Sequence, residues 1–524
     1  MERAGPGRAF SSASVIAAAF VTLAIVAGVA GCGRRERARD SRPNVVLITI
    51  DTFRADHLGA SGYARATTPV LDALAATGVR FTQAIAQAPE TAPSHASMLT
   101  GLYPPEHGVR SNGIHALPED VTTFAERARA AGYRTAAFVG SFVLDRKFGL
   151  AQGFDVYDDA METRDVARAG RAREADAPPG VWYGNIIEGA FERPASEVNA
   201  AALRWLNPNH RAPFFLWVHF YDPHAPYAPP READIFPKRD ATSSHARWDA
   251  FEREQLAGAG AGRATPRDPD SASASALDPG AERRMATLLE DLVALYDGEI
   301  RACDTEVGVL LARLDALGLR DNTLVIVTSD HGESLTENGY YFRHGWYLYD
   351  NVLRVPLIIR FPGRVLAGQV VTEPVELVNL YRTMCNAVPE LHQPNPHTDL
   401  VSRAADAASN APIDRPTGPD YTYSETFLRK QLVGGHPQYA LREPGWKLVT
   451  AFRDGLPARS HLYCLARDPG ETRDVLTEEP GVAFRLDRIL RTFLDRENVA
   501  RAESSRIELD PATLEKLRAL GYIN

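Results

Sequence analysis

Cysteine and long apolar segments are scarce in this chain of 524 residues, and its 58 basic residues are outnumbered by 67 acidic ones. The 4 cysteines are irregularly spaced, which excludes a disulfide framework and a cysteine-based zinc cluster. We expect Cys303, Cys385 and Cys464 to be buried free thiols. The formal net charge of -9 argues against a nucleic-acid partner, because surfaces that bind nucleic acids usually carry a basic excess.

The one long apolar run lies at the amino terminus and follows two arginines, Arg3 and Arg8. A basic start, an apolar middle and a small-residue end at 29–32 are typical of a secretory signal, and the run is short for a membrane span. Its end, Val-Ala-Gly-Cys, resembles a bacterial lipobox, which implies cleavage before Cys32 and lipidation of that cysteine. We therefore predict export to the periplasm or cell surface with a lipid anchor in the membrane. An uncleaved N-terminal anchor is the alternative.

Apolar, β-branched runs alternate with helical patterns along most of the chain. The predicted strands are 44–50, 132–139, 214–220 and 323–328, and the predicted helices include 69–78, 121–131 and 302–317. Such alternation predicts an α/β fold with a large, mostly parallel sheet sandwiched by helices. A small C-terminal α+β subdomain is predicted by two strands and a terminal helix, at 439–450, 460–465 and 511–522.

These patterns divide the chain into a signal segment at 1–32, a tether at 33–42, a large domain at 43–395 and a C-terminal subdomain at 420–524. An insert at about 257–283 contains Gly-Ala and Ser-Ala repeats with scattered prolines. Because it can bury little apolar surface, we expect this insert to be mobile.

Acidic side chains follow two of the predicted buried strands. Asp51 comes directly after the strand at 44–50, and Asp330 and His331 follow the strand at 323–328. Sites in parallel sheets form beyond the carboxyl ends of the strands, so we expect these side chains to meet. Carboxylate oxygen and neutral imidazole suit a divalent metal. Either aspartate alone could merely cap a helix or turn, but two such strand ends favour a metal site.

A helix is predicted to begin near Thr91, since Pro93 follows and proline is favoured in a first turn. The free amides and the dipole of a helix N-terminus attract anions. Thr91 would then lie where a phosphoryl or sulfuryl group can bind. The alternative is that Thr91 only caps the helix.

Residues 91–101 resemble the sulfatase signature, which is Cys-x-Pro-Ser-Arg followed by small residues and Thr-Gly. The resemblance implies an alkaline phosphatase-like fold. It places Thr91 on the cysteine that sulfatases oxidise to formylglycine and His95 on their arginine, in a substrate-binding position. Threonine cannot become formylglycine, so the hydrated-aldehyde mechanism of sulfatases is not expected here.

The same region resembles the nucleotide pyrophosphatase/phosphodiesterases, which use a metal-bound threonine in a Thr-x-Pro-x-His segment. Those enzymes continue with Thr-Gly-Leu-Tyr-Pro and His-Gly, and this chain has both, at 100–104 and 107–108. The resemblance implies that Thr91 is nucleophile and metal ligand and that Asn112 binds a phosphoryl oxygen.

Two further segments carry a resemblance. Residues 329–345 resemble the zinc-dependent phosphoethanolamine transferases, which implies an active-site role for His344. Residues 219–227 resemble the sulfatase Pro-His-x-Pro segment, which implies that His224 assists at the leaving group. Asp222 is an alternative ligand for a second metal.

The sequence thus predicts a metal-dependent hydrolase of phosphate or sulfate esters, acting on a small-molecule, lipid or glycan ester. Asp51, Asp330, His331 and Thr91 would hold one or two divalent ions, which could be zinc, manganese or calcium. Arg54 is expected to contact the metal carboxylates or the anionic substrate. The alternatives are a membrane-tethered transferase of a phospho group to lipid or glycan, and a non-catalytic binding protein with the same fold.

Overall fold

The computed structural model describes residues 1, 42–161, 193–239, 279–338, 340–391, 399–409, 421–453, 456–496 and 506–519. The predicted lipidation residue Cys32, nearly all of the signal and tether, and residues 257–278 of the predicted insert lie outside the described residues. In the part of the chain that is described, no helix has both the length and the apolar character needed to span a membrane.

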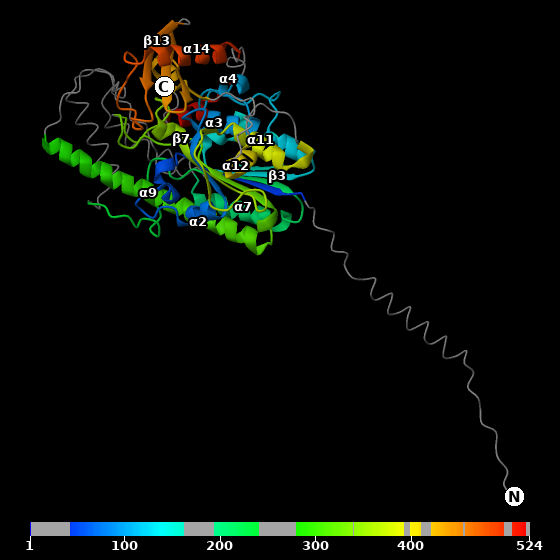
Figure 1. The fold of residues 1–524 in the computed structure, drawn as a ribbon. Coiled ribbons are helices and arrows are strands. Elements are labelled where there is room, and N and C mark those ends of the chain that lie inside the picture. Colours follow the sequence, from blue (N-terminus) through cyan, green and yellow to red (C-terminus); the bar gives the residue numbers. More distant parts are fainter. Residues whose placement is uncertain are drawn as a thin grey trace. The chain divides into compact units, whose positions relative to one another are not determined.

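Nine strands of the described residues form one mixed sheet in the order β4-β3-β5-β1-β6-β7-β2-β8, and β9 pairs with β2 (Figure 1). Their bounds are β1 Asn44–Ile50, β2 Val79–Ile85, β3 Arg134–Val139, β4 Val156–Asp158, β5 Phe214–Phe220, β6 Thr323–Thr328, β7 Arg354–Arg360, β8 Gln369–Val371 and β9 Val375–Glu376. All neighbouring strands are parallel except β7, which runs antiparallel to β6 and β2. The predicted, mostly parallel α/β sheet is therefore confirmed.

Alternate residues of the central strands face two layers of helices. On β1, Val46 and Ile48 pack on one layer, while Val45 and Leu47 pack on the other. The first layer contains α2 Pro69–Thr77, α7 Ala195–Asn209 and α9 Pro279–Ala316, and the second contains α3 Thr91–Thr100, α5 Phe124–Ala130, α11 Asn379–Ala387 and α12 Leu400–Ser409. Figure 1 shows α9 and α3 on opposite sides of the sheet. Strands covered on both faces read as continuous apolar runs, and that is why the sequence predicted them.

The remaining helical elements are short or lie near the C-terminus. They are α4 Pro104–His107, α10 Asp350–Leu353, α13 Leu428–Val433, α14 Pro480–Arg496, α16 Pro511–Ala519 and the 3-10 turns Ala55–His57, Gly59–Ser61, Phe142–Leu144, Arg146–Phe148, Arg320–Asn322 and Pro389–Leu391. The helix predicted at 302–317 is longer than expected, because α9 already begins at Pro279. Residues 279–283 of the predicted insert are therefore helical.

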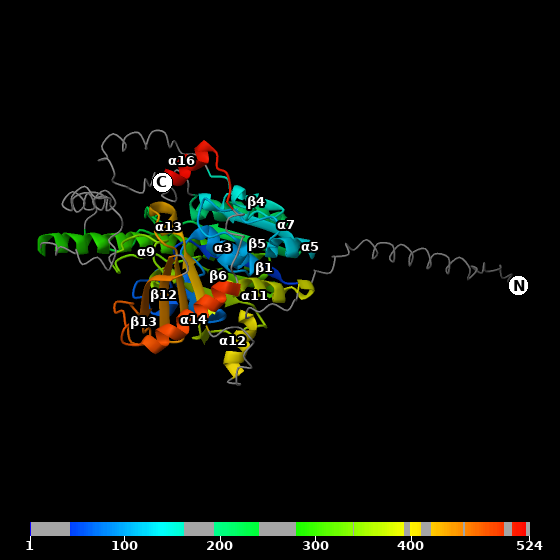
Figure 2. The same cartoon turned by 90° about the horizontal axis from the view of Figure 1, so that it is seen from above.

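A four-stranded antiparallel sheet follows, in the order β10-β11-β12-β13. The bounds are β10 Thr422–Thr426, β11 Gln438–Glu443, β12 Trp446–Arg453 and β13 Leu456–Tyr463. Leu441 and Leu448 on one face pack on α14, which lies beside the sheet in Figure 2. Ala440 and Val449 on the other face pack on Leu348 of the large domain. The expected small α+β subdomain is present.

The last helix, α16, packs on the large domain. Leu517 is fully buried and lies against Gly113, where an added Cβ would come within 2.5 Å of Leu517 Cδ2. Gly113 also has a φ of 78°, so glycine is needed there for two reasons. The amide of Ile507 donates to the carbonyl of Ile114 at 3.2 Å. These contacts support the loop that contains Asn112.

Candidate active site

Three segments of the chain meet at the carboxyl ends of β1 and β6. Asp51 follows β1, Asp330 and His331 follow β6, and Thr91 is the first residue of α3. The two strands are parallel neighbours, with Thr49 paired to Thr328, so their ends deliver the two aspartates to one place. The side chains of the four site residues are fully buried. Ligand atoms of Asp51, Asp330 and His331 lie within 4.8 Å of one another.

The Thr91 hydroxyl faces this cluster. Its Oγ1 lies 3.4 Å from Asp51 Oδ2 and 3.5 Å from His331 Nε2. His331 Nε2 is in turn 3.6 Å from Asp330 Oδ2 and 3.7 Å from Asp51 Oδ1. His331 Nδ1 lies 3.0 Å from the Gly332 carbonyl. Because a carbonyl only accepts, Nδ1 carries the proton and Nε2 presents its lone pair to the cluster.

Two carboxylate oxygens in the cluster, Asp51 Oδ1 and Asp330 Oδ2, are buried and have no hydrogen-bond partner among the described residues. Such oxygens are unfavourable unless a cation compensates them. Burial raises the pKa of Asp51, against the opposing effect of His331 and His224. Burial also disfavours a charged His331, but the neighbouring Asp330 and Asp51 outweigh it and raise the pKa of that ring. This donor set fits a divalent cation.

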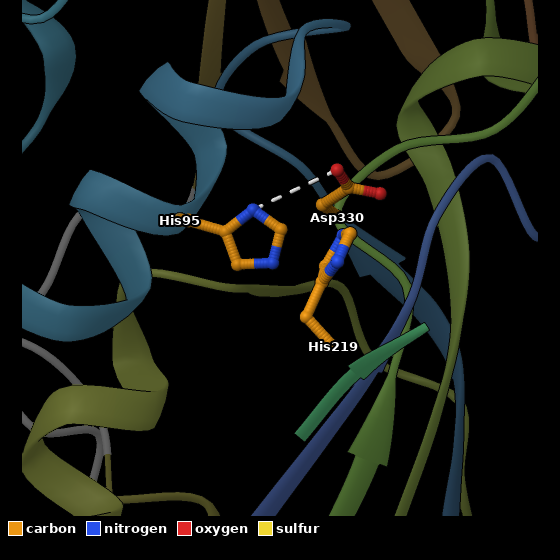
Figure 3. Close-up of side chains that lie close together, drawn as sticks. All are labelled: His95, His219 and Asp330. Carbon is orange, nitrogen blue, oxygen red and sulfur yellow. Dashed lines mark ion pairs between the residues drawn. The ribbon is translucent and has the colours of Figure 1, made fainter. Parts of the chain in front are cut away.

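His95, His219 and Asp330 form a second group of possible ligands, which shares Asp330 with the first (Figure 3). His95 Nδ1 lies 3.7 Å from Asp330 Oδ2 and 2.8 Å from the Thr91 carbonyl. Since that carbonyl can only accept, Nδ1 of His95 carries a proton and offers no lone pair to a metal. The group of Asp51, Asp330 and His331 is therefore the one that fits an ion.

His95 was predicted to bind the substrate, but both of its ring nitrogens contact the protein. Its Nε2 lies 3.0 Å from Thr49 Oγ1, which also accepts a hydrogen bond of 3.0 Å from Trp217 Nε1. Burial lowers the pKa of His95 to about 3, so the ring is neutral. Through these contacts His95 connects the sheet to the backbone of Thr91 and holds the start of α3.

Arg54 is likewise engaged by the protein instead of the metal carboxylates or a substrate. Its Nε and Nη2 donate to the Asp56 carboxylate at 2.9 and 2.7 Å. Its Nη1 donates to the Glu333 carbonyl at 3.1 Å and pairs with Glu337 Oε1 at 2.8 Å. With the whole guanidinium used in this way, Arg54 clamps the loop after β1 to the loop after β6.

Asp222, the alternative ligand for a second metal, is hydrogen-bonded to the start of helix α7. Its Oδ2 accepts a hydrogen bond of 2.9 Å from the amide of Ala195, at the start of α7. The Cys303 thiol donates to the Asp222 carbonyl at 3.1 Å. Neither ligand group among the described residues includes Asp222. Cys303, Cys385 and Cys464 are buried free thiols, as predicted.

His224 and His344 border the cluster. The ring centroid of His344 lies 4.4 Å from that of His331 and 5.0 Å from that of His224. His344 Nδ1 is 3.3 Å from Glu333 Oε1, and His224 Nδ1 is 2.7 Å from the Ala225 carbonyl. Burial lowers the pKa of His224 to about 4 and that of His344 well below its usual range. Both rings are neutral at pH 7, and an anion entering the site would raise these pKa values.

Asn112 is anchored at the start of α3. Its side-chain Oδ1 accepts from the backbone amide of Ala92 at 2.8 Å, and its backbone amide donates to Glu90 Oε2 at 3.0 Å. Its Nδ2 is buried and has no hydrogen-bond partner in the described part of the chain. A buried donor beside Thr91 is what the predicted contact with a phosphoryl oxygen requires.

Three residues at the cluster were not predicted to belong to the site. Thr52 has a φ of 53°, which strains a β-branched residue, and its buried Oγ1 has no hydrogen-bond partner among the described residues. His219 Nε2 lies 3.5 Å from Asp51 Oδ2, and Glu333 contacts His344 as described above. Only His219 left a signal, as a histidine within the apolar run 214–220.

An α/β sheet with a buried hydroxyl, carboxylates and histidines at its strand ends defines a hydrolase of the alkaline phosphatase-like fold. The family model described as Sulfatase matches residues 43–389. The chain therefore belongs to the sulfatase family, whose members hydrolyse ester bonds.

Individual relatives agree with this assignment. The Ulvan-active sulfatase of Formosa agariphila is 29% identical over 335 residues, which cover 62% of this chain and 57% of that protein. Arylsulfatase K of Canis lupus familiaris is 26% identical over 502 residues, or 92% of this chain and 88% of that protein. The phosphonate monoester hydrolase of Agrobacterium radiobacter has a similar structure, with a TM-score of 0.64 and 24% identity over 90% of this chain and 100% of that chain. At this identity the structural likeness concerns the fold.

Proposed function

We propose that this chain is a metal-dependent hydrolase of phosphate or sulfate esters in which Thr91 is the nucleophile. The observation that carries the proposal is the position of Thr91 Oγ1, 3.4 Å from Asp51 Oδ2 and 3.5 Å from His331 Nε2. Threonine cannot be converted to formylglycine, so the nucleophile favours phosphoryl over sulfuryl chemistry. A small molecule, a lipid or a glycan could carry the ester.

A divalent ion held by Asp51, Asp330 and His331 would supply the positive charge that lowers a hydroxyl pKa by several units. Two carboxylates and an imidazole suit zinc or manganese, whereas calcium prefers oxygen ligands alone. Thr91 Oγ1 attacks phosphorus or sulfur, and a bond to Oγ1 forms as the bond to the leaving oxygen breaks. Asn112 Nδ2 binds a non-bridging oxygen, and the dipole of α3 favours the negative charge beside its first residue.

Asp51 Oδ2, 3.4 Å from Thr91 Oγ1, takes the hydroxyl proton during the attack. His224 or His344, protonated once the anionic ester is bound, gives its proton to the leaving oxygen. Water then attacks the ester on Thr91 and gives a proton back to that histidine, while Thr91 Oγ1 leaves with the proton held by Asp51, which releases the acid and restores the hydroxyl. Glu333, 3.3 Å from His344 Nδ1, orients that ring. Every atom is accounted for by one ester and one water.

The replacement of Thr91 by alanine tests the nucleophile. We expect turnover to fall by about 10⁴-fold or more, because removing a nucleophile commonly has an effect of that size. Leaving-group release from an aryl phosphate diester, an aryl phosphate monoester and an aryl sulfate measures both activity and preference. Thr91→Ser keeps the hydroxyl and serves as the control. Activity of Thr91→Ala near that of the unchanged protein would remove Thr91 from the mechanism.

The acceptor decides between hydrolase and transferase. With water as the only acceptor, a hydrolase releases both products in equal amounts through many turnovers. A transferase stops after one equivalent of leaving group, with the phosphoryl or sulfuryl group left on Thr91. Mass spectrometry of the protein after the reaction separates these outcomes.

We also propose that the chain is exported and that Cys32 carries a lipid, on the strength of the signal-like segment that precedes it. Expression with a labelled fatty acid, compared between the unchanged chain and Cys32→Ala, tests this. Label in the unchanged chain alone is expected, and equal label or none in both contradicts the lipid anchor.

A further inference from the structure

A pocket of about 390 Å³ is lined in part by residues 347–349, just after His344, and by none of the residues in the cluster around Thr91. Strands β12 and β13 form its floor. One wall comes from Arg429 on α13 and from residues 434–436, and the other comes from residues 347–349, which follow His344. The pocket therefore joins the small subdomain to the segment that carries His344.

The strand register explains why this face of the small sheet is open at one end. Val449 pairs with His461, and Ala451 pairs with Arg459. The apolar end of the face is covered, because Val449 and Ala440 pack against Leu348. Arg459 lies beyond that contact and lines the pocket.

The lining of the pocket is basic, although the whole chain carries a net charge of -9. Arg429, Arg453 and Arg459 line it, and the described lining residues include no Asp or Glu. Arg453 Nε donates to His436 Nε2 at 2.9 Å, which holds the guanidinium at the pocket wall. Three guanidinium groups around one cavity attract an anion and match the geometry of sulfate, phosphate or carboxylate groups.

A row of tyrosines runs from the pocket to the residues around His344. Ring centroids are 5.1 Å apart for Tyr340 and Tyr347, 5.8 Å for Tyr347 and Tyr349, and 6.1 Å for Tyr349 and Tyr463. The Tyr340 hydroxyl donates to the carbonyl of His344 at 2.6 Å. Tyr347 is three residues from His344, a distance of at most about 11 Å along extended chain.

We propose that this pocket is a subsite for an acidic sugar unit of an anionic glycan whose ester group reacts at Thr91. The arginines bind the sulfate, phosphate or carboxylate of the sugar, and the tyrosine faces contact its ring. A concave site of this volume suits a small ring, whereas a membrane surface would require an exposed basic patch. The claim that the glycan reacts at Thr91 rests on the function proposed above. The claim that its acidic sugar binds in the pocket does not.

The test uses Arg453→Gln/Arg459→Gln, two changes on the rim of the small sheet. Binding is measured by calorimetry on Thr91→Ala protein, with a heparin-derived tetrasaccharide as the probe. We expect the double change to raise the Kd of the tetrasaccharide by about 10- to 100-fold, since two charge-assisted contacts are lost. The kcat/KM for a small aryl ester, measured with Thr91 intact, should stay within about twofold.

Arg473→Gln/Arg488→Gln is the matched control, because it removes the same charge from exposed positions outside the pocket. An equal loss of affinity in this control would overturn the proposal, as would unchanged affinity in the pocket variant. Equally tight binding of an uncharged tetrasaccharide, or tighter binding of anionic lipid vesicles that depends on Arg453 and Arg459, would also overturn it. If the unchanged protein turns over no ester, the proposed function fails while the binding result still stands or falls alone.

Discussion

The hydroxyl of Thr49 hydrogen-bonds to both Trp217 of β5 and His95 of α3. Thr49→Val keeps the shape of the side chain and removes the hydroxyl, which leaves two buried ring nitrogens without a partner. Each unsatisfied group is unfavourable by about 1–3 kcal/mol, so we expect a loss of about 2–6 kcal/mol in the free energy of unfolding, measured with urea. The kcat should fall as well, because His95 holds the carbonyl of Thr91.

Thr49→Ser is the control, since it retains both hydrogen bonds and loses one methyl group. Equal stability of the valine and serine variants would show that the chain from Trp217 to His95 contributes nothing. A loss of stability without any change in kcat would show that His95 does not position Thr91.

The unpaired oxygens of Asp51 and Asp330 predict that a metal stabilises the fold. An ion that binds only the folded protein, at 100 times its Kd, adds about 2.7 kcal/mol. Removal of the metal with a chelator should therefore lower the Tm, and zinc or manganese should restore it. Asp330→Asn should lower the metal content found by elemental analysis and abolish the shift. No bound ion after loading, together with an unchanged Tm, would contradict a metal site.

Some site residues could be predicted from the sequence and others could not. Asp51 and Asp330 were found because each follows an apolar strand, and parallel strand ends meet. The surroundings of His95 and Arg54 were not found, because their partners are remote in sequence. Thr49 lies 46 residues from His95, and the Glu333 carbonyl lies 279 residues from Arg54. The motifs therefore drew attention to His95 and Arg54 but could not predict which residues these side chains contact.

At the scale of elements, α16 supports the loop that carries Asn112. Leu517 is fully buried against Gly113, and a charged side chain there would be unfavourable. We expect Leu517→Asp to release residues 506–519 and to lower kcat by about 10-fold, because a small displacement of a positioning residue can have effects of up to 10²-fold. Limited proteolysis measures the release, and ester turnover measures the kcat.

Leu517→Met, which conserves volume, is the control and should keep α16 in place. Release of α16 with unchanged kcat would mean that the loop around Asn112 holds its position without this helix. Unfolding of the whole chain by Leu517→Asp would be visible as a loss of the urea transition, and would contradict a local role.

The four strands predicted from the sequence correspond to β1, β3, β5 and β6, which pair in parallel as expected, whereas β7 was not among the predicted strands. The apolar run of β7 reads like its parallel neighbours, but β7 is antiparallel to β6 and β2. Direction depends on the path of the connecting chain, which periodicity does not encode. The first half of α9 was not predicted because its start, near Pro279, directly follows a composition typical of an insert.

At the scale of the whole molecule, a buried carboxylate joins the two sheets. Glu376 on β9 accepts from the Tyr423 amide of β10 at 2.9 Å and from the Tyr103 hydroxyl at 2.7 Å. Gln87 Nε2 lies 3.4 Å from the same carboxylate. Arg110 adds a second connection through its bidentate pair with Glu425 of β10. The loop between α3 and α5 is therefore held by the small subdomain.

This junction predicts a pH dependence of stability. Burial raises the pKa of Glu376 to about 7, against three opposing hydrogen bonds. The folded state thus binds this proton more tightly than the unfolded state, so the stabilisation is complete below about pH 4.5 and is lost as the pH rises through about 7. At about 1.4 kcal/mol per pKa unit, the change is about 2–4 kcal/mol. Glu376→Gln cannot titrate, so urea unfolding between pH 5 and 8 should show the stability of the unchanged protein falling relative to this variant. Parallel curves for the two proteins would mean that Glu376 does not hold its proton in the folded state.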